Sequence, residues 1–205
     1  MAEIKERPIL FSGPRVRAIL AGQKTQTRRP IRDPCNEVST LIVQNFFSGV
    51  NAVLCTDRNE DWVERLSPFG CVGDRLWVRE THSIVPASSY CPSSDRQVQP
   101  LPHRVSPDGD WWAIYRADWD RSEPRWRPSI HMPRWASRIT LEVTGVRVER
   151  VREISPKDCL AEGIKGETLP KLRFGALWNA TGGKKPGCEW TENPWVWVIE
   201  FRVFA

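Results

Sequence analysis

The sequence predicts one α+β domain in which short helices flank a β-sheet. Three segments alternate apolar and polar residues with the period of a strand, at residues 75–80, 138–151 and 195–204. Two short segments, at residues 12–22 and 155–163, begin and end with helix-capping residues. The length of 205 residues and the apolar content of 40% fit a single domain with its own core, spanning residues 1–205.

The N-terminal part predicts a strand followed by a helix. Residues 8–11 form a short apolar run, and Ser12 then provides a helix cap. An apolar stripe with helical spacing follows at Val16, Ile19 and Leu20. Gly22 ends this helix, so the polar segment after it should project from the helix end.

The middle of the chain is harder to assign. Residues 41–43 predict a strand and residues 45–59 an irregular lobe, and we assign no function to residues 30–70. Residues 82–110 are rich in Ser, Pro, Gln and Asp, which predicts a loop insertion that is poorly ordered without ligand. The apolar residues 111–115 predict the next strand.

The C-terminal part predicts the clearest elements. In residues 138–151 the apolar phase changes near Thr144 and Gly145, which predicts a β-bulge that helps the sheet curl. The helix after Ser155 should end at Gly163. A further helix over 168–181, a flexible connection over 182–187 and a last strand over 195–204 complete the chain.

The charge and composition favour a nucleotide or nucleic-acid partner. The formal net charge is +5, and the basic residues comprise 23 Arg and 7 Lys, beside 11 Trp. Arginine makes bidentate contacts with phosphate and stacks on bases. The alternative is that arginine packs over tryptophan on an ordinary protein surface.

Other classes of protein are not favoured. The first residues contain no apolar run typical of a signal peptide, and no segment has the length of a membrane span. The six cysteines form no CxxC pair and have no histidine at ligand spacing. We therefore expect a cytoplasmic protein with reduced thiols, no membrane contact, no metal and no cofactor.

A polar motif follows the first helix. In an extended segment Thr25, Thr27 and Arg29 share one face, and Lys24 lies three residues before Thr27. An amine and a hydroxyl this close can act together as base and nucleophile. The alternative is a solvated turn with a surface lysine.

The motif from Gly22 to Arg29, Gly-x-Lys-Thr-x-Thr-x-Arg, resembles the signature of the ASCH domain, a member of the PUA-like superfamily. Residues 154–164 resemble a second motif of the family. The whole chain is similar to the longer ASCH-like proteins of phages and prophages. The resemblance implies a PUA-like mixed β-barrel with short flanking helices.

The resemblance also implies an activity. Small bacterial members of the family are N4-acetylcytidine amidohydrolases, and their catalytic Lys, Thr and Glu fall on Lys24, Thr27 and Glu162. Thr27 would attack the acyl carbonyl with Lys24 as base, and Glu162 would protonate the leaving cytosine. In the alternative assignment, Lys24 holds the oxyanion and water attacks directly.

Local physical chemistry agrees with these roles. Glu162 lies at a helix C-terminus, where the helix dipole raises a carboxyl pKa. Burial and the charges of Arg28 or Arg29 would lower the pKa of Lys24. The alternative for Glu162 is an exposed ion pair with Lys165.

Further residues are candidates for substrate binding. Thr25 and Arg29 could stabilise the oxyanion, together with backbone N–H groups. Arg28 and Trp135 could contact the substrate, with Trp135 stacking on a base. Glu80 is either a second carboxylate of the site or, as we favour, a surface charge or the structural partner of an arginine.

The expected partner is a modified cytosine nucleoside or a nucleic acid. Two alternatives to the amidohydrolase remain: a non-catalytic RNA- or DNA-binding module and an ASCH-type ribonuclease. The combination of Lys24, Thr27 and Glu162 favours the amidohydrolase.

Overall fold

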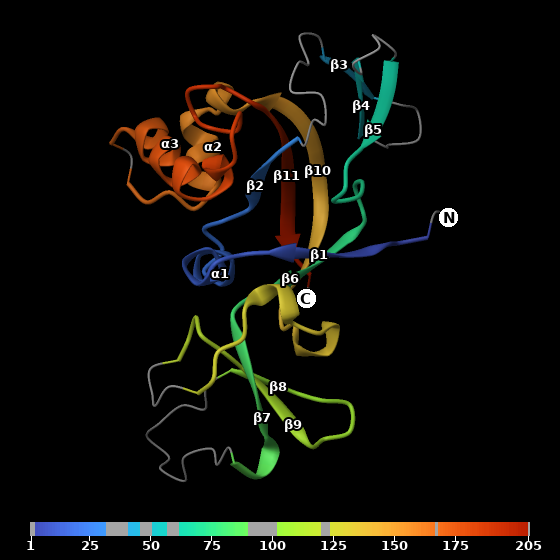
Figure 1. Cartoon of the computed structure of the whole chain (residues 1–205), viewed down its shortest axis with the longest axis vertical. Coiled ribbons are helices and arrows are strands. Elements are labelled where there is room, and N and C mark those ends of the chain that lie inside the picture. Colours follow the sequence, from blue (N-terminus) through green and yellow to red (C-terminus); the bar gives the residue numbers. More distant parts are fainter. Residues whose placement is uncertain are drawn as a thin grey trace.

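The computed structural model describes residues 3–31, 41–45, 51–56, 62–89, 102–119, 124–166 and 168–204. In these ranges the chain forms one five-stranded and two three-stranded β-sheets, with helices around the large sheet (Figure 1). The fold class is therefore α+β, as predicted. Among the described residues, no helix combines the length and apolarity needed to cross a bilayer.

The strands are β1 (Glu6–Leu10), β2 (Gln26–Pro30), β3 (Leu41–Asn45), β4 (Asn51–Thr56), β5 (Trp62–Leu66), β6 (Arg75–Arg79), β7 (His82–Pro86), β8 (His103–Val105), β9 (Trp111–Tyr115), β10 (Thr140–Arg150) and β11 (Trp195–Val203). The α-helices are α1 (Gly13–Leu20), α2 (Pro156–Ala161) and α3 (Pro170–Ala180). Short 3-10 helices are η1 (Ala87–Ser89), η2 (Ser129–His131), η3 (Arg134–Ala136), η4 (Val151–Glu153) and η5 (Gly182–Lys184).

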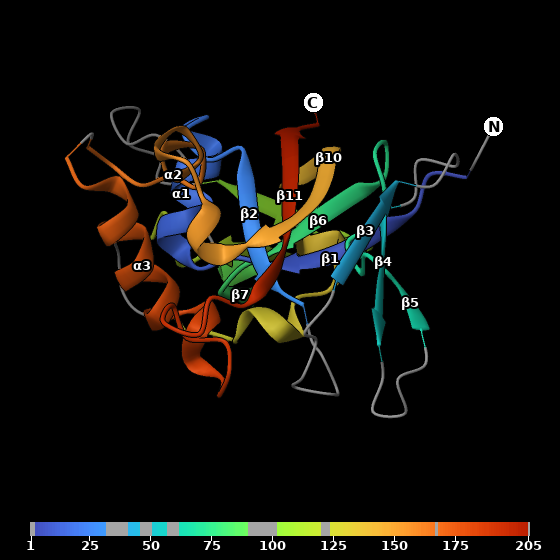
Figure 2. The same cartoon turned by 90° about the horizontal axis from the view of Figure 1, so that it is seen from above.

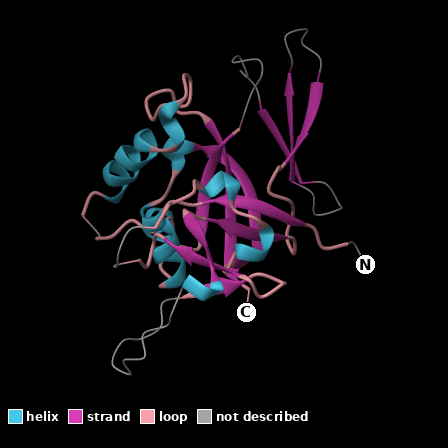
Figure 3. Ribbon diagram, turned by 60° about the horizontal axis from the view of Figure 1, so that its bottom comes forward, coloured by secondary structure: helices cyan, strands magenta, loops and turns pink. Residues whose placement is uncertain are grey.

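The large sheet has the order β1-β6-β10-β11-β2. β1 and β6 are parallel and the other pairs are antiparallel, so the sheet is mixed as expected. β1 and β2 form its two edges, so the described strands do not close into the predicted barrel. Figure 3 shows the strands of this sheet at the centre of the molecule and the longest helix on one side.

The predicted β-bulge is present in β10. Its register with β11 shifts between Val143 and Gly145. Leu141 and Val143 are buried in the core before the bulge, and Val146 is buried in the same core after it. The extra residue therefore keeps both halves of the strand packed on one core, as the change of apolar phase predicts.

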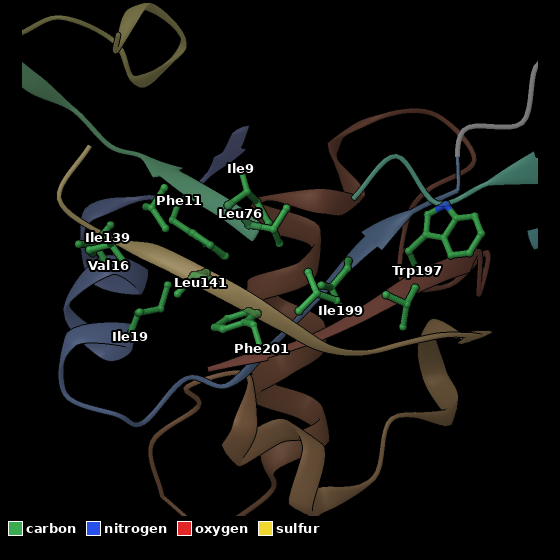
Figure 4. Close-up of a cluster of buried hydrophobic side chains, with 13 residues drawn as sticks. Ile9, Phe11, Val16, Ile19, Leu76, Ile139, Leu141, Trp197, Ile199 and Phe201 are labelled. Atoms are coloured by element: carbon green, nitrogen blue, oxygen red, sulfur yellow. The ribbon is translucent and has the colours of Figure 1, made fainter. Parts of the chain in front are cut away.

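The main core lies between α1 and the large sheet (Figure 4). Val16 and Ile19 of α1 pack in the same buried cluster as Leu76 and Ile199. The opposite face of β11 packs against α2 and α3 through Val196 and Val198, in a cluster with Phe174, Trp178 and Cys159. β11 is thus buried on both faces and separates two cores.

The helices end close to the predicted positions. Gly22, after α1, and Gly163, after α2, have positive φ angles of 68° and 88°, a conformation that glycine adopts without strain. The side chain of Ser155 accepts a hydrogen bond from Asp158 N and caps α2. The connection predicted over residues 182–187 contains η5, and Gly183 in it is buried against Trp178.

The prediction of a poorly ordered loop over residues 82–110 is wrong for its described parts. β7 and β8 flank β9 in a three-stranded sheet, and His82 is fully buried. Polar residues such as Ser83 conceal the strand in the sequence, because pairing with β9 rather than an apolar pattern stabilises it. Residues 90–101 lie outside the described residues.

The segment expected to be irregular over residues 45–59 contains a strand as well. β4 pairs with β3 and β5 in an antiparallel sheet, and the predicted strand over 41–43 lies within β3. Residues 46–50 and 57–61 lie outside the described residues.

Candidate active site at the edge of the large sheet

The motif after α1 meets the end of α2 at the β2 edge of the large sheet. Figures 1 and 2 show α1, α2 and α3 on this side of the sheet. Thr25 N donates a hydrogen bond to Ala161 O at 2.9 Å, and Lys24 and Glu162 form an antiparallel β-bridge. Two segments 138 residues apart in the sequence are therefore fixed to each other through their backbones.

Lys24 is buried, with 2% of its surface exposed. Its Nζ atom lies 2.7 Å from Gln26 O, 3.0 Å from Glu162 O and 2.6 Å from Glu162 Oε2. An ammonium group has three hydrogens, so these three acceptors satisfy all of them. The protonated side chain is thus held in one position, and none of its hydrogen bonds goes to Thr27.

Burial lowers the pKa of Lys24 to about 8. The carboxylate of Glu162 opposes this shift, while the charges of Arg15 and Arg29 add to it. The sequence predicts the direction of the shift and the contribution of Arg29, but not that of Arg15. Lys24 can therefore lose its proton far more easily than an ordinary lysine.

Glu162 is buried between two cations. Its Oε2 atom lies 2.6 Å from Lys24 Nζ, and its Oε1 atom lies 3.2 Å from Arg28 Nη1. The sequence predicts the effect of the helix dipole on Glu162 but does not predict these two cationic partners. The predicted alternative of an exposed pair with Lys165 is wrong, because only 4% of Glu162 is exposed.

Arg28 is the centre of an ion-pair network rather than a free substrate ligand. Its guanidinium contacts Glu149 at 2.6 Å, Glu162 at 3.2 Å and Asp158 at 3.4 Å, and its side chain has no exposed surface. Arg147 extends the network to Glu149 and Asp158. Arg28 therefore holds Glu162 and two further carboxylates, and its buried guanidinium makes these contacts where the sequence predicts a contact with substrate.

Thr27 lies on the opposite face of β2 from Arg28. The register places Thr27 beside Ile199 and Arg28 beside Val198, which belong to the two different cores. Thr27 is 1% exposed, whereas Thr25 is exposed. The expectation that Lys24, Thr27 and Glu162 line a solvent-facing cleft is thus wrong for this arrangement, in which all three are buried.

Arg29 connects the two edges of the sheet. Its Nη2 atom donates to Leu10 O at 2.6 Å, so the side chain joins β2 to β1. Its Cζ atom lies 5.3 Å from the centre of the Phe11 ring, and Lys24 Nζ lies 5.8 Å from the same ring. Arg29 is therefore close to the Lys24 site, on the Phe11 side.

Glu80 and Trp135 belong to other parts of the molecule. Glu80 is buried and its two oxygens accept hydrogen bonds from Arg138 at 2.8 and 3.0 Å, which is the structural pairing we favoured. Trp135 packs on a buried cluster that contains Tyr115 and Met132, beside the β7-β9-β8 sheet. Both side chains are thus engaged away from Lys24, and the structure does not bring them together with the Lys24–Glu162 pair.

Sequence reasoning missed several residues of the site. Gln26 Nε2 donates to Asp158 O at 2.9 Å, and Glu149 and Asp158 complete the network around Arg28. Polar residues at alternate positions 26 and 28 of a buried strand were the available signal, because such residues need partners. Arg15 had no such signal, since it lies in a helix with other basic residues.

A surface hollow lies beside the two segments that carry Lys24 and Glu162. It has a volume of about 390 Å³, and its lining residues are Gln23, Leu160, Gly163, Ile164, Lys165 and Gly166. Gln23 precedes Lys24 and Gly163 follows Glu162. A Cβ atom on Gly163 would lie 3.4 Å from Lys24 Cβ, so Gly163 packs closely against the lysine side chain. Among the described residues, no group of three or more His, Cys, Asp or Glu side chains could hold a metal ion.

The depressed pKa of Lys24 predicts how stability depends on pH. The folded state disfavours the protonated lysine, so the penalty is complete below about pH 8 and disappears above the ordinary pKa of 10.5. Between these values, wild type should gain stability relative to Lys24→Met by an amount on the order of 3 kcal/mol. Urea unfolding of both proteins across this pH range measures the difference. If the difference in unfolding free energy between the two proteins stays constant with pH, the pKa shift of Lys24 is contradicted. Tyr115 and the cysteines titrate in both proteins, so their contributions cancel in this difference.

Comparison with known proteins gives little further identification. No protein-family model and no curated protein matches the chain. A solved structure, the ASCH domain from Lactobacillus crispatus JV V101, aligns with 97% of this chain and 79% of its own chain. The identity is 12% and the TM-score is 0.40, so this similarity carries no conclusion about function.

Proposed function

We propose that the chain is an ASCH-like amidohydrolase that removes the acyl group from N4-acetylcytidine or a related N4-acylcytosine compound. The observation that supports catalysis is the buried pair of Lys24 and Glu162, with 2.6 Å between Nζ and Oε2. A lysine whose pKa is about 8 beside a carboxylate is suited to moving protons near neutral pH. The substrate class rests on the resemblance of the two sequence motifs.

The pair can supply the base and the acid in one step. Transfer of a proton from Lys24 Nζ to Glu162 Oε2 leaves a neutral amine and a protonated carboxyl group. The amine takes the hydroxyl proton of Thr27 as Oγ1 bonds to the acyl carbon, and Glu162 gives its proton to the cytosine as the C–N bond breaks. Water then hydrolyses the acyl-threonine and releases the acid.

Substrate binding must rearrange the resting site. All hydrogens of Lys24 have acceptors other than Thr27, so Nζ has to exchange one of them for Thr27 Oγ1. Catalytic hydrogen bonds often form only in the complex with substrate. The hollow is lined by Gln23 and Gly163, the chain neighbours of Lys24 and Glu162, and we assign the cytosine base to it.

The test is deacetylation followed by ultraviolet absorbance. Purified protein should convert N4-acetylcytidine to cytidine at the same rate before and after treatment with a chelator, since the scheme uses protein groups alone. Absence of turnover with the nucleoside, the nucleotide and an acetylated RNA would contradict the proposal. Loss of turnover on chelation with recovery on adding zinc would contradict the covalent scheme.

A non-catalytic nucleic-acid-binding module is the second candidate. The observation in its favour is that Lys24 and Arg28 are buried and that each of their side-chain nitrogens is hydrogen-bonded, as in a structural network. In that case, RNA or DNA should bind without being chemically changed. Lys24→Met should be less stable than wild type, and neither protein should show turnover. Cleavage of the RNA in the same samples would instead favour the ribonuclease.

A further inference from the structure

Two arginines beside the Lys24–Glu162 pair lack a carboxylate partner. Arg15 Nη2 donates to Thr181 Oγ1 at 3.0 Å, and its buried Nε atom has no hydrogen-bond partner. Arg29 donates to the backbone oxygen of Leu10. Within the described part of the chain, neither guanidinium forms an ion pair.

The neighbouring arginines are arranged differently. Arg28 contacts three carboxylates, and Arg147 contacts Glu149, Asp158 and Glu200. Of these carboxylates, Glu162 is bound by Lys24 as well as by Arg28. The negative charges at this edge are therefore used by other cations, and positive charge is left around Arg15 and Arg29.

Contacts bring the two arginines to the same part of the fold: Arg15 donates to Thr181, which directly precedes η5, and η5 contacts β2, the strand that carries Arg29. Their electrostatics agree with this placement. Burial lowers the pKa of Arg29 to about 10, and the next largest cause is the charge of Arg15. Burial also lowers the pKa of Arg15, which the charge of Glu162 opposes. Both arginines remain charged at neutral pH, and an anion between them would relieve their mutual repulsion.

We propose that Arg15 and Arg29 bind a phosphate group of the ligand beside the Lys24–Glu162 pair. Guanidinium groups match phosphate through paired N–H donors, and the free Nε of Arg15 is one such donor. Arg15 is half-buried and its partner Thr181, at the end of α3, is exposed, so this contact lies at the protein surface. The exposed Lys184 and Lys185 lie shortly after Thr181 in the chain and add positive charge to this surface.

The proposal narrows the ligand to a nucleotide or a strand of nucleic acid. The choice of a cytosine-containing ligand rests on the proposed function. The phosphate contact itself does not require the protein to be catalytic. A neutral nucleoside would leave the two arginines without a counter-charge. The phosphate can be the 5′-phosphate of a mononucleotide or a backbone phosphate of a polymer.

Calorimetric titration separates these cases. Cytidine, cytidine 5′-monophosphate and a short oligocytidylate without terminal phosphate are titrated into wild type, Arg15→Ala and Arg17→Ala. Arg17 is an exposed residue of the same helix and serves as the matched control. A phosphate-bearing ligand should bind about tenfold more tightly than cytidine, because one charge-assisted hydrogen bond gives about this factor.

Arg15→Ala should remove this advantage, Arg15→Lys should keep part of it, and Arg17→Ala should keep it all. Preference for the monophosphate assigns the site to mononucleotides, and preference for the oligonucleotide alone assigns it to a backbone. Equal affinity for cytidine and both phosphate ligands, or an unchanged advantage in Arg15→Ala, overturns the proposal. Because the readout is binding, absence of deacetylation leaves this result intact.

Discussion

Replacing Lys24 with methionine should lower the free energy of unfolding at pH 7 by about 3 kcal/mol, the lower range for breaking a buried ion pair. The substitution leaves Glu162 buried with Arg28 as its remaining cation at 3.2 Å. It also leaves the oxygens of Gln26 and Glu162 without their donor. Urea unfolding followed by circular dichroism measures the loss.

Two further variants show whether the loss comes from the pair. Lys24→Met combined with Glu162→Gln should be more stable than Lys24→Met alone, because the uncompensated charge is removed. Lys157→Met, an exposed lysine at the start of α2, should change stability by less than about 0.5 kcal/mol. If Lys24→Met is as stable as Lys157→Met, the buried pair does not support the fold.

The second large effect is expected on turnover. Thr27→Ala and Glu162→Gln should each reduce kcat for deacetylation by about a hundredfold or more, the lower range for losing an acid or a nucleophile. Thr27→Ser should keep partial activity, because the hydroxyl group remains. Adding Lys24→Ala to Thr27→Ala should reduce the rate little further, since base and nucleophile act as one unit.

Thr25→Ala is the matched control for this experiment. Thr25 is exposed two residues before Thr27, so its loss should affect kcat less. Thermal melting must show that each variant is folded, because Thr27 and Glu162 are buried. Full activity of Thr27→Ala would remove the acyl-threonine and favour attack by water, with Lys24 holding the oxyanion.

Local signals in the sequence predicted much of the fold. Ser155 and Gly163 mark the beginning and the end of α2. The change of apolar phase in residues 138–151 predicts the position of the bulge near Gly145. The order of the strands had no local signal, because it depends on pairing between distant segments such as β1 and β6. The strand β7 was missed for the same reason, since its partner β9 stabilises it.

The candidate site was predicted less completely than the fold. The motif and its resemblance identified Lys24 and Glu162, which lie in contact. The partners of Arg28 could not be predicted, because Glu149 and Glu162 are more than 100 residues away in the sequence. Trp135 and, in one of its two readings, Glu80 are expected at the site from residue type, and residue type does not determine which part of the fold a side chain joins.

The bulge in β10 has a consequence for the site as well as for the core. After the shift at Gly145, Val146 faces the main core, and Arg147 and Glu149 face α2 beside Arg28. Without the extra residue the parity of the strand would invert, and these two charges would point into the apolar core. Both the packing of the core and the placement of these charges therefore fix the number of residues between Val143 and Val146. An insertion or a deletion in this segment should be more damaging than a substitution that keeps its length.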